Sequence, residues 1–227
     1  VPCTIVVPHG NSLEKNAAMR ALGATLVEHG DDFQAAREHA TALAQQTGAG
    51  TVPSYHADLV LGVSTYWWEL LRAAPHITHL YVPIGMGSGA CAAIAAKLAL
   101  GHAAQVIGVI STGAQTYAHS LAAGQVVAAP VSTQLADGLA VREADAQALA
   151  VLQSQLAGLV QVSDEEVAEA MRVLYRCTHN VAEGAGAAAM AAAMQQANTL
   201  QGTGAVLGLP VTGGNVDAPT FAQVLQG

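Results

Sequence analysis

The hydrophobic positions of this chain alternate between short apolar runs and longer segments with helical spacing. The apolar runs predict strands at residues 3–7, 25–28, 80–82, 105–110, 160–162 and 205–209. The segments between them predict helices at residues 13–22, 31–47, 59–71, 90–100, 117–123, 144–152, 163–177, 184–196 and from 219 onward. Ser163 and Glu166 have the spacing of a capping box at the start of one of these helices. This alternation predicts an α/β fold built on open, mostly parallel sheets.

The stretch from Leu80 to Leu100 holds the strongest candidate for a ligand site. A buried strand is followed there by a turn containing Gly85, Gly87 and Gly89, and then by a helix of small residues. Glycines let the backbone approach a ligand closely, and the first amides of a helix attract anions, so this order favours a bound phosphate. The glycine spacing matches neither the dinucleotide-binding pattern nor the P-loop pattern. An ordinary strand-to-helix turn therefore remains the alternative.

The composition adds an expectation about assembly and excludes two classes of partner. Hydrophobic residues make up 52% of the chain and charged residues 11%, so part of the surface must be neutral or covered by another chain. We therefore expect a homodimer or a tetramer. The net charge is −8, and the 8 lysines and arginines do not cluster, which argues against nucleic acid and anionic membranes. No apolar run is long enough to span a membrane and no signal peptide is visible, so we expect a soluble, cytoplasmic protein.

The cysteines and histidines do not indicate a metal site. Cys3, Cys91 and Cys177 are odd in number, far apart and set among apolar residues, so we expect buried free thiols rather than a disulfide. Among the 9 histidines only His76 and His79 lie close together, and we expect surface positions for them.

Three predicted strands end in turns with chemically useful residues. These turns are Gly85 to Gly89, Ser111 to Gly113, and Thr212 to Asn215. In open parallel sheets ligands bind outside the carboxyl ends of the strands, so we expect the three turns to form one pocket.

Four segments, taken in order, match a known family. They are Val82 to Gly89, Ala136 to Val141, Glu183 to Ala187, and Thr212 to Asp217, with Ala21 to Gly30 as a further match. In these segments the chain resembles the serine/threonine dehydratases, which are fold type II pyridoxal-phosphate enzymes. The resemblance implies the fold of that class, which is similar to the tryptophan synthase β subunit and has open twisted, mostly parallel sheets in two domains.

The resemblance also implies a division of the chain. The change of composition at residues 54–58 is our candidate for the domain crossing. Residues 1–56 would form part of the small α/β domain, and residues 57–227 would form the large, cofactor-binding domain.

The resemblance further implies a site for pyridoxal 5'-phosphate. Its phosphate would bind to the glycine loop, which comprises Gly85, Met86, Gly87, Ser88 and Gly89. Thr212, followed by Gly213, stands where the family has serine and would form a hydrogen bond with the pyridine nitrogen. Glu183 would line the ring. A neutral hydroxyl does not hold a proton on that nitrogen as a carboxylate would, which favours eliminating a β-hydroxyl over transamination. The alternatives are an ordinary turn hydroxyl for Thr212 and a solvated helix-start carboxylate for Glu183.

Two departures from the family pattern concern catalysis and metal binding. The Ser-Phe-Lys-like segment, whose lysine attaches the cofactor, and the Asn-His-Gly-like segment are both absent. The only lysines, Lys15 and Lys97, are not placed to be desolvated beside the ring. We therefore expect that an N-terminal part carrying the catalytic lysine is missing, which leaves the catalytic residues unknown. Thr133 and Gln134 stand where some relatives have a metal-binding glutamate, so no cation is expected at Asp137.

The leading functional hypothesis is a pyridoxal-phosphate-dependent dehydratase, an ammonia-lyase acting on threonine or serine. The lysine would remove the Cα proton, the β-hydroxyl would leave, and hydrolysis would give a 2-oxo acid and ammonia. Racemisation, β-replacement and dehydration of a hydroxyectoine-derived amino acid are alternatives, and the unusual stretch from Gly62 to Trp68 is compatible with a non-standard substrate. A further alternative is a non-catalytic module that binds a phosphate ligand. A dinucleotide oxidoreductase is disfavoured. Such an enzyme would need an acidic residue about 20 residues beyond the loop to hold a ribose, and Ile110 to Gly113 stands at that position instead.

Overall fold

The computed structural model describes all residues of the chain, 1–227, and the chain forms two compact units. The first unit comprises Val1–Pro53 and Asp217–Gln223, and the second comprises Ser54–Val216 and Val224–Gly227. The elements of the first unit are β1 (Thr4–Val7), α1 (Leu13–Ala21), β2 (Thr25–Glu28) and α2 (Phe33–Thr47). Those of the second unit are α3 (Ala57–Ala73), β3 (His79–Pro83), α4 (Ser88–Leu100), β4 (Gln105–Ser111), α5 (Thr116–Ala123), the 3-10 helix η1 (Asp137–Leu139), α6 (Ala146–Gln155), β5 (Gly158–Val162), α7 (Asp164–Thr178), α8 (Gly184–Gln195), α9 (Ala197–Leu200) and β6 (Leu207–Gly208). The last helix, α10 (Ala218–Gln226), contains residues of both units.

The first unit is a short strand–helix–strand–helix motif. Strands β1 and β2 pair in parallel, with Thr4 opposite Thr25, and α2 packs against β1. Both helices begin at side-chain caps: the Ser12 hydroxyl accepts the N–H of the third helical residue, and Asp32 does the same for α2. These caps explain why the helix starts were visible in the sequence.

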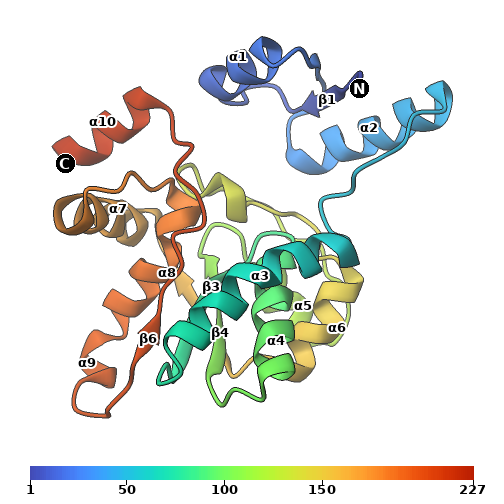
Figure 1. The fold of residues 1–227 in the computed structure, drawn as a ribbon. Coiled ribbons are helices and arrows are strands. Elements are labelled where there is room, and N and C mark those ends of the chain that lie inside the picture. The colour runs from blue at the N-terminus through green and yellow to red at the C-terminus, as the bar shows by residue number, and fades with distance from the viewer. The chain divides into compact units, whose positions relative to one another are not determined.

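The second unit is organised around a four-stranded parallel sheet with the order β5-β4-β3-β6 (Figure 1). Tyr81 of β3 lies opposite Ile107 of β4, and Val109 of β4 lies opposite Val160 of β5. On its other side β3 pairs with β6, where Leu80 lies opposite Gly208. Because all four strands are parallel, their carboxyl ends open at the same edge of the sheet.

Helices cover the sheet on both sides. Helix α4 packs on β3 and β4 and is flanked by α3 and α6, whereas α8 packs on β3, β4 and β5 and is flanked by α7 (Figure 1). Side chains alternate along a strand, so Leu80 and Val82 join the core with α4, while Tyr81 between them reaches Gln196 at the end of α8. The alanine and glycine content of α4 and α8 lets these helices approach the strands closely, since both are largely buried.

Every predicted strand and helix is present, with ends that shift by at most three residues, whereas the 3-10 helix η1 was not predicted. Strand β6 is limited to Leu207–Gly208, shorter than the predicted 205–209, although the Val206 carbonyl just before it accepts the N–H groups of Thr78 and His79. Helix α9 was not predicted. The chain turns at Gln196 and starts a further helical turn, whereas its polar residues indicated only the end of α8.

The expectation of three buried thiols was wrong for two of them. All three cysteines are free, but Cys3 and Cys177 are exposed and only Cys91 is buried. Cys91 lies in the first turn of α4 against the core, and burial raises the pKa of its thiol. Apolar neighbours in the sequence did not distinguish the interior of the unit from its surface.

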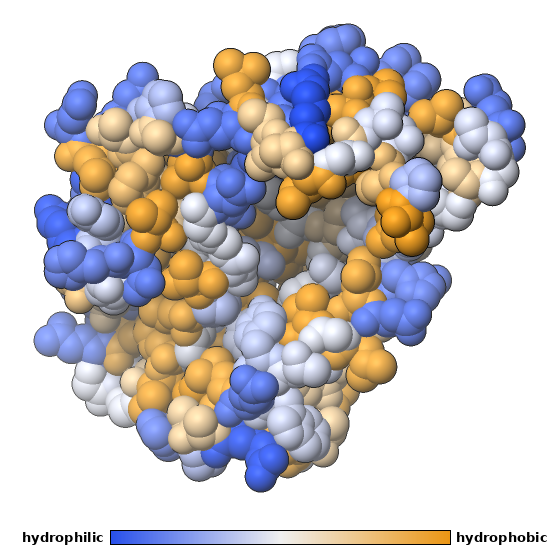
Figure 2. Space-filling model, turned by 45° about the horizontal axis from the view of Figure 1, so that its top comes forward, coloured by the Kyte–Doolittle hydropathy of each residue, from blue (hydrophilic) through white to orange (hydrophobic).

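The surface carries many apolar side chains, in keeping with the low content of charged residues. Figure 2 shows hydrophobic residues in orange lying among hydrophilic ones in blue over the face that it draws. Large hydrophobic side chains that are exposed in the second unit include Leu61, Trp68 and Leu98. No helix of the chain has the length and apolar character needed to cross a membrane.

The capping box at the start of α7 gives a test of local stability. Ser163 Oγ accepts the N–H of Glu166 at 3.2 Å, and Glu166 Oε2 accepts the N–H of Ser163 at 2.8 Å. We predict that Ser163→Ala lowers the free energy of unfolding by about 1 kcal/mol, because one of the first amides of α7 loses its acceptor. Urea denaturation followed by circular dichroism measures the change. The control is Ser154→Ala at an exposed position of α6, where the hydroxyl only bonds a carbonyl of its own helix and the effect should stay within about 0.5 kcal/mol. Equal effects of both variants would contradict a capping role.

Candidate functional site

The loops that follow β3 and β6 lie at the same edge of the sheet in the second unit. The glycine loop follows β3 directly, and the segment from Thr212 to Asn215 follows β6. Both strands run parallel and are direct neighbours, so the sequence-predicted phosphate loop and hydroxyl turn open on a common side. This arrangement is the one that a shared site requires.

The glycine loop presents amides that the protein itself does not use. The last sheet bond of β3 runs from the N–H of Ile84 to the carbonyl of Val109. Gly87 then takes a φ of +97°, a conformation that favours glycine, and serves as the N-cap of α4 without a side-chain bond. The N–H groups of Gly87, Ser88, Gly89 and Ala90 have no acceptor within the chain. Free amides at the start of a 13-residue helix form a ready site for an anion.

Space for a ligand exists on one side of this loop and not on the other. A Cβ added to Gly87 would lie 2.8 Å from Ala148 Cβ and 3.0 Å from the Tyr117 hydroxyl, so this side is packed against the core. A Cβ added to Gly89 would meet nothing within 4 Å. The open side and the free amides together fit a phosphate group.

The glycine loop and the Ala136 to Val141 segment are in direct backbone contact. A Cβ on Gly85 would lie 2.3 Å from the carbonyl oxygen of Gly138, and a Cβ on Gly138 would lie 2.8 Å from Ala185 Cβ at the start of α8. Real Cβ atoms do not come so close, so each of these positions can hold only glycine without a shift of the backbone. The glycines therefore bring three of the family-like segments together.

The fourth segment joins the same cluster through Glu183 and Gly213. The N–H of Glu183 donates to the carbonyl of Gly213 at 3.0 Å, and its carboxylate accepts the N–H of Asn215 at 3.2 Å. A Cβ on Gly186 would lie 2.3 Å from the Gly213 carbonyl oxygen. Glu183 is the N-cap residue of α8, but its side chain makes no capping bond within that helix. It holds the turn after β6 instead, a role that the sequence did not indicate.

Thr212 and Ser88 leave their hydroxyls available. Thr212 is exposed, Ser88 is half-buried, and neither hydroxyl makes a hydrogen bond within the chain. Ser111, in contrast, is buried and accepts the N–H of Gly113 within its own turn. A Cβ on Gly113 would lie 2.6 Å from the N of Thr133, so the third turn is packed against a neighbouring loop.

Asp164 organises the loop that precedes Asp137. Its carboxylate accepts the Thr133 hydroxyl at 2.5 Å and the N–H groups of Gln134 and Leu135 at 2.8 and 3.3 Å. Asp137 is exposed and accepts the N–H of Gly138 at 2.8 Å. No group of three or more His, Cys, Asp or Glu side chains in the chain could hold a metal ion. No pattern in the sequence indicated this role of Asp164, which also lies in the acidic first turn of α7.

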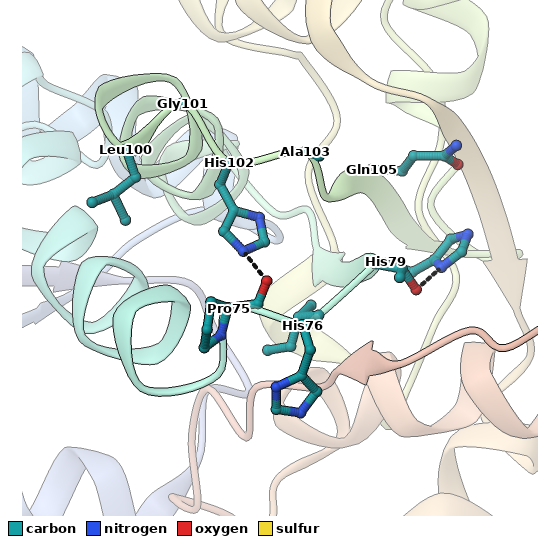
Figure 3. Close-up of a pocket in the computed structure, with 10 residues that line it drawn as sticks. Pro75, His76, His79, Leu100, Gly101, His102, Ala103 and Gln105 are labelled. Atoms are coloured by element: carbon teal, nitrogen blue, oxygen red, sulfur yellow. Dashed lines mark hydrogen bonds between the residues drawn. The ribbon is translucent and has the colours of Figure 1, made fainter.

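A cavity of about 510 Å³ lies at the opposite edge of the sheet, where β3 and β4 begin (Figure 3). His76, His79 and His102 line it. His102 contacts the carbonyl of Pro75 at 3.1 Å and accepts the N–H of Ala104, and Figure 3 shows its ring turned toward Pro75. Both ring nitrogens of His102 therefore serve the fold. This cavity is remote from the glycine loop because it lies at the amino ends of the strands.

The two lysines of the chain lie in different units. Lys15 is in the first turn of α1, and Lys97 is in the last turn of α4, at the end of the helix away from the glycine loop.

Comparison with known proteins identifies the family of the chain. Residues 1–213 match the family described as pyridoxal-phosphate dependent enzyme. L-threonine ammonia-lyase of Geobacter sulfurreducens is 32% identical over 229 residues, which cover 100% of this chain and 56% of that protein. The enzyme of the same name from Thermotoga maritima is 29% identical over 226 residues, with 99% and 56% coverage. The chain thus spans about half the length of these relatives.

The solved structures agree with the sequence comparison. The processed form of threonine deaminase isoform 2 from Solanum lycopersicum superposes with a TM-score of 0.90 at 26% identity, covering 99% of this chain and 66% of that one. The chain therefore belongs to the pyridoxal-phosphate dependent enzymes. Its predicted fold type II architecture and its resemblance to the serine/threonine dehydratases are both confirmed.

The contact between Gly186 and Gly213 can be tested directly. We predict that Gly186→Ala destabilises the protein by about 1–3 kcal/mol, because the new methyl group meets a backbone carbonyl that cannot rotate away. Hydrogen exchange should also become faster in residues 212–215. The matched control is Gly62→Ala, another helical glycine, where nothing lies within 4 Å and the gain in helix propensity should stabilise by about 0.5–1 kcal/mol. Thermal unfolding compares the two. If Gly186→Ala leaves the stability unchanged, the close approach of Gly186 to Gly213 is not required.

Proposed function

We propose that this chain binds pyridoxal phosphate at the glycine loop and forms the cofactor-holding part of a hydroxyamino-acid ammonia-lyase that acts on threonine or serine. The observation that carries this proposal is the meeting of the four family-like segments at one edge of the sheet, beside amides without acceptors. The names of the relatives support the same substrate class, since several are threonine ammonia-lyases or dehydratases. The products would be a 2-oxo acid and ammonia.

The residues that would hold the cofactor divide into two groups. The backbone amides of Gly85, Met86, Gly87, Ser88 and Gly89 would bind its phosphate. The hydroxyl of Thr212, beside Gly213, would bond the pyridine nitrogen, and Glu183 would line the ring while its carboxylate holds Asn215. When bound, pyridoxal phosphate supplies an electron-withdrawing ring that stabilises negative charge at the substrate Cα.

The hydroxyl of Thr212 would direct the reaction toward elimination. A hydroxyl donates or accepts a hydrogen bond but carries no negative charge at neutral pH, so it does not hold a proton on the pyridine nitrogen as a carboxylate would. The ring then withdraws electrons less strongly, which favours departure of the β-hydroxyl over long-lived charge at Cα. Thr212 keeps its hydroxyl unpaired within the chain, as this role requires.

The wider organisation of the protein forms part of the proposal. We assign residues 1–56 to a small domain and residues 57–227 to the large, cofactor-binding domain, and we assign the lysine that attaches the cofactor to neither Lys15 nor Lys97. A homodimer or tetramer in the cytoplasm, a small hydroxyamino acid as the substrate, and no nucleic-acid or membrane partner complete the proposal.

The deciding experiment is a product assay on the full-length protein. Incubation with pyridoxal phosphate and L-threonine or L-serine should release 2-oxobutanoate or pyruvate together with ammonia. A panel of other hydroxyamino acids tests the substrate class. If the protein binds the cofactor and racemises the substrate without releasing a 2-oxo acid, its reaction is racemisation and not elimination. If it binds the cofactor and converts no substrate, it is a binding module.

The open side of Gly89 gives a second test of the cofactor site. We predict that Gly89→Ala weakens the binding of pyridoxal phosphate at least about tenfold, because the added methyl group occupies space that the phosphate would fill. Stability should not fall, since alanine favours the helix and no atom obstructs it. Fluorescence titration measures the affinity for pyridoxal phosphate, and thermal unfolding measures the stability. Gly158→Ala, also without neighbours within 4 Å but at the start of β5, is the control and should bind normally. Unchanged affinity of Gly89→Ala would place the phosphate elsewhere.

A further inference from the structure

The glycine loop is supported from the core by two aromatic donors. The Tyr117 hydroxyl of α5 donates to the carbonyl oxygen of Met86 at 2.8 Å, and Trp67 Nε1 of α3 donates to the carbonyl oxygen of Gly89 at 3.2 Å. Both side chains are buried, with 1% and 0% exposure. They therefore contact the packed side of the loop and leave its open side free.

The Tyr117 hydroxyl is itself fixed by the start of α6. Its oxygen accepts the N–H of Asp145 at 3.3 Å, and the Asp145 carboxylate caps α6 by accepting the N–H groups of Gln147 and Ala148. With its lone pair facing α6, the hydroxyl directs its hydrogen at Met86. Burial raises the pKa of Tyr117, so the phenol stays protonated and remains a donor at physiological pH.

The bond from Tyr117 determines the direction in which one loop amide points. All peptide bonds of the chain are trans, and in a planar trans peptide the carbonyl and the N–H point in opposite directions. Tyr117 draws the Met86 carbonyl toward the core, so the N–H of Gly87 in the same peptide points away from it. Gly89 lies in the first turn of α4, so the helix sets the direction of the Ala90 N–H, and Trp67 supports that turn through the Gly89 carbonyl. Neither of these amides has an acceptor within the chain.

We propose that Tyr117 is a positioning residue for phosphate binding, with Trp67 as a second support. This inference rests on the proposed function, since it takes the phosphate of pyridoxal phosphate as the ligand of the glycine loop. Tyr117 does not touch the ligand. It orients the amides before the ligand arrives, so that binding the phosphate does not require the loop to be ordered first.

The test separates phosphate recognition from general stability. Dissociation constants for pyridoxal phosphate and for pyridoxal, which lacks the phosphate, are measured with the full-length protein after cofactor removal. The ratio of the two constants is the phosphate preference. Tyr117→Phe should lower this preference about tenfold. The affinity for pyridoxal phosphate should fall while the affinity for pyridoxal stays unchanged, because only the phosphate contacts the loop. The 31P signal of the bound cofactor should shift as well.

The matched control is Tyr81→Phe, which also removes the hydroxyl of a fully buried tyrosine. Tyr81 donates to Gln196 on the side of the sheet that α8 covers, so its loss should lower the melting temperature and leave the phosphate preference unchanged. Trp67→Phe should lower the preference by about threefold, since one of the two supports remains. If Tyr117→Phe does not fold, Trp67→Phe decides by the same criterion.

The outcomes distinguish this inference from the function on which it rests. An unchanged phosphate preference in the folded variants, with normal binding by the wild-type protein, would overturn the positioning role and leave the proposed cofactor site intact. An equal loss of affinity for both ligands would reduce Tyr117 to a structural residue. A wild-type protein that binds no pyridoxal phosphate would overturn both.

Discussion

The site depends on backbone segments that approach one another more closely than side chains would allow. Gly85 contacts Gly138, Gly138 contacts Ala185, and Gly186 contacts Gly213. In each case a Cβ atom on the glycine would clash with the neighbouring segment. Through these contacts, loops that are far apart in the sequence meet at the start of α8. The segments that resemble the family pattern are therefore rich in glycine for a steric reason, in addition to any contact with a ligand.

The parallel sheet and the buried helices provide the frame for this convergence. The direction of β3 and β6 brings their following loops to one edge, and the small residues of α8 let that helix lie close to the strands. The high hydrophobic content of the chain is partly explained by this helix, because its alanines are buried among neighbours on several sides. A core of small residues holds the backbone segments close and gives little room for their relative movement.

Hydrogen bonds then set the orientation of the groups that the glycines bring together. Tyr117 and Trp67 hold carbonyls of the glycine loop, Glu183 holds the turn that contains Gly213, and Asp164 holds the loop before Asp137. In each case a buried or half-buried side chain satisfies backbone groups that would otherwise lack partners. The amides of the glycine loop that remain free lie beside the open side of Gly89.

The order of elements, the parallel α/β class and the position of the glycine loop could be predicted from the sequence. Local rules suffice for these features: apolar periodicity defines strands and helices, Ser163 with Glu166 marks a helix start, and glycines mark the turn at 85–89. The family resemblance also followed from short segments in fixed order. The tertiary structure alone decided that Cys3 and Cys177 are exposed, that Glu183 and Asp164 hold loops, and that Tyr117 faces Met86. The roles of Glu183, Asp164 and Tyr117 depend on contacts between residues that lie 29 to 32 positions apart, and the exposure of the two cysteines depends on which parts of the chain the core covers. Local spacing carries no information about such contacts, because packing between distant segments selects them.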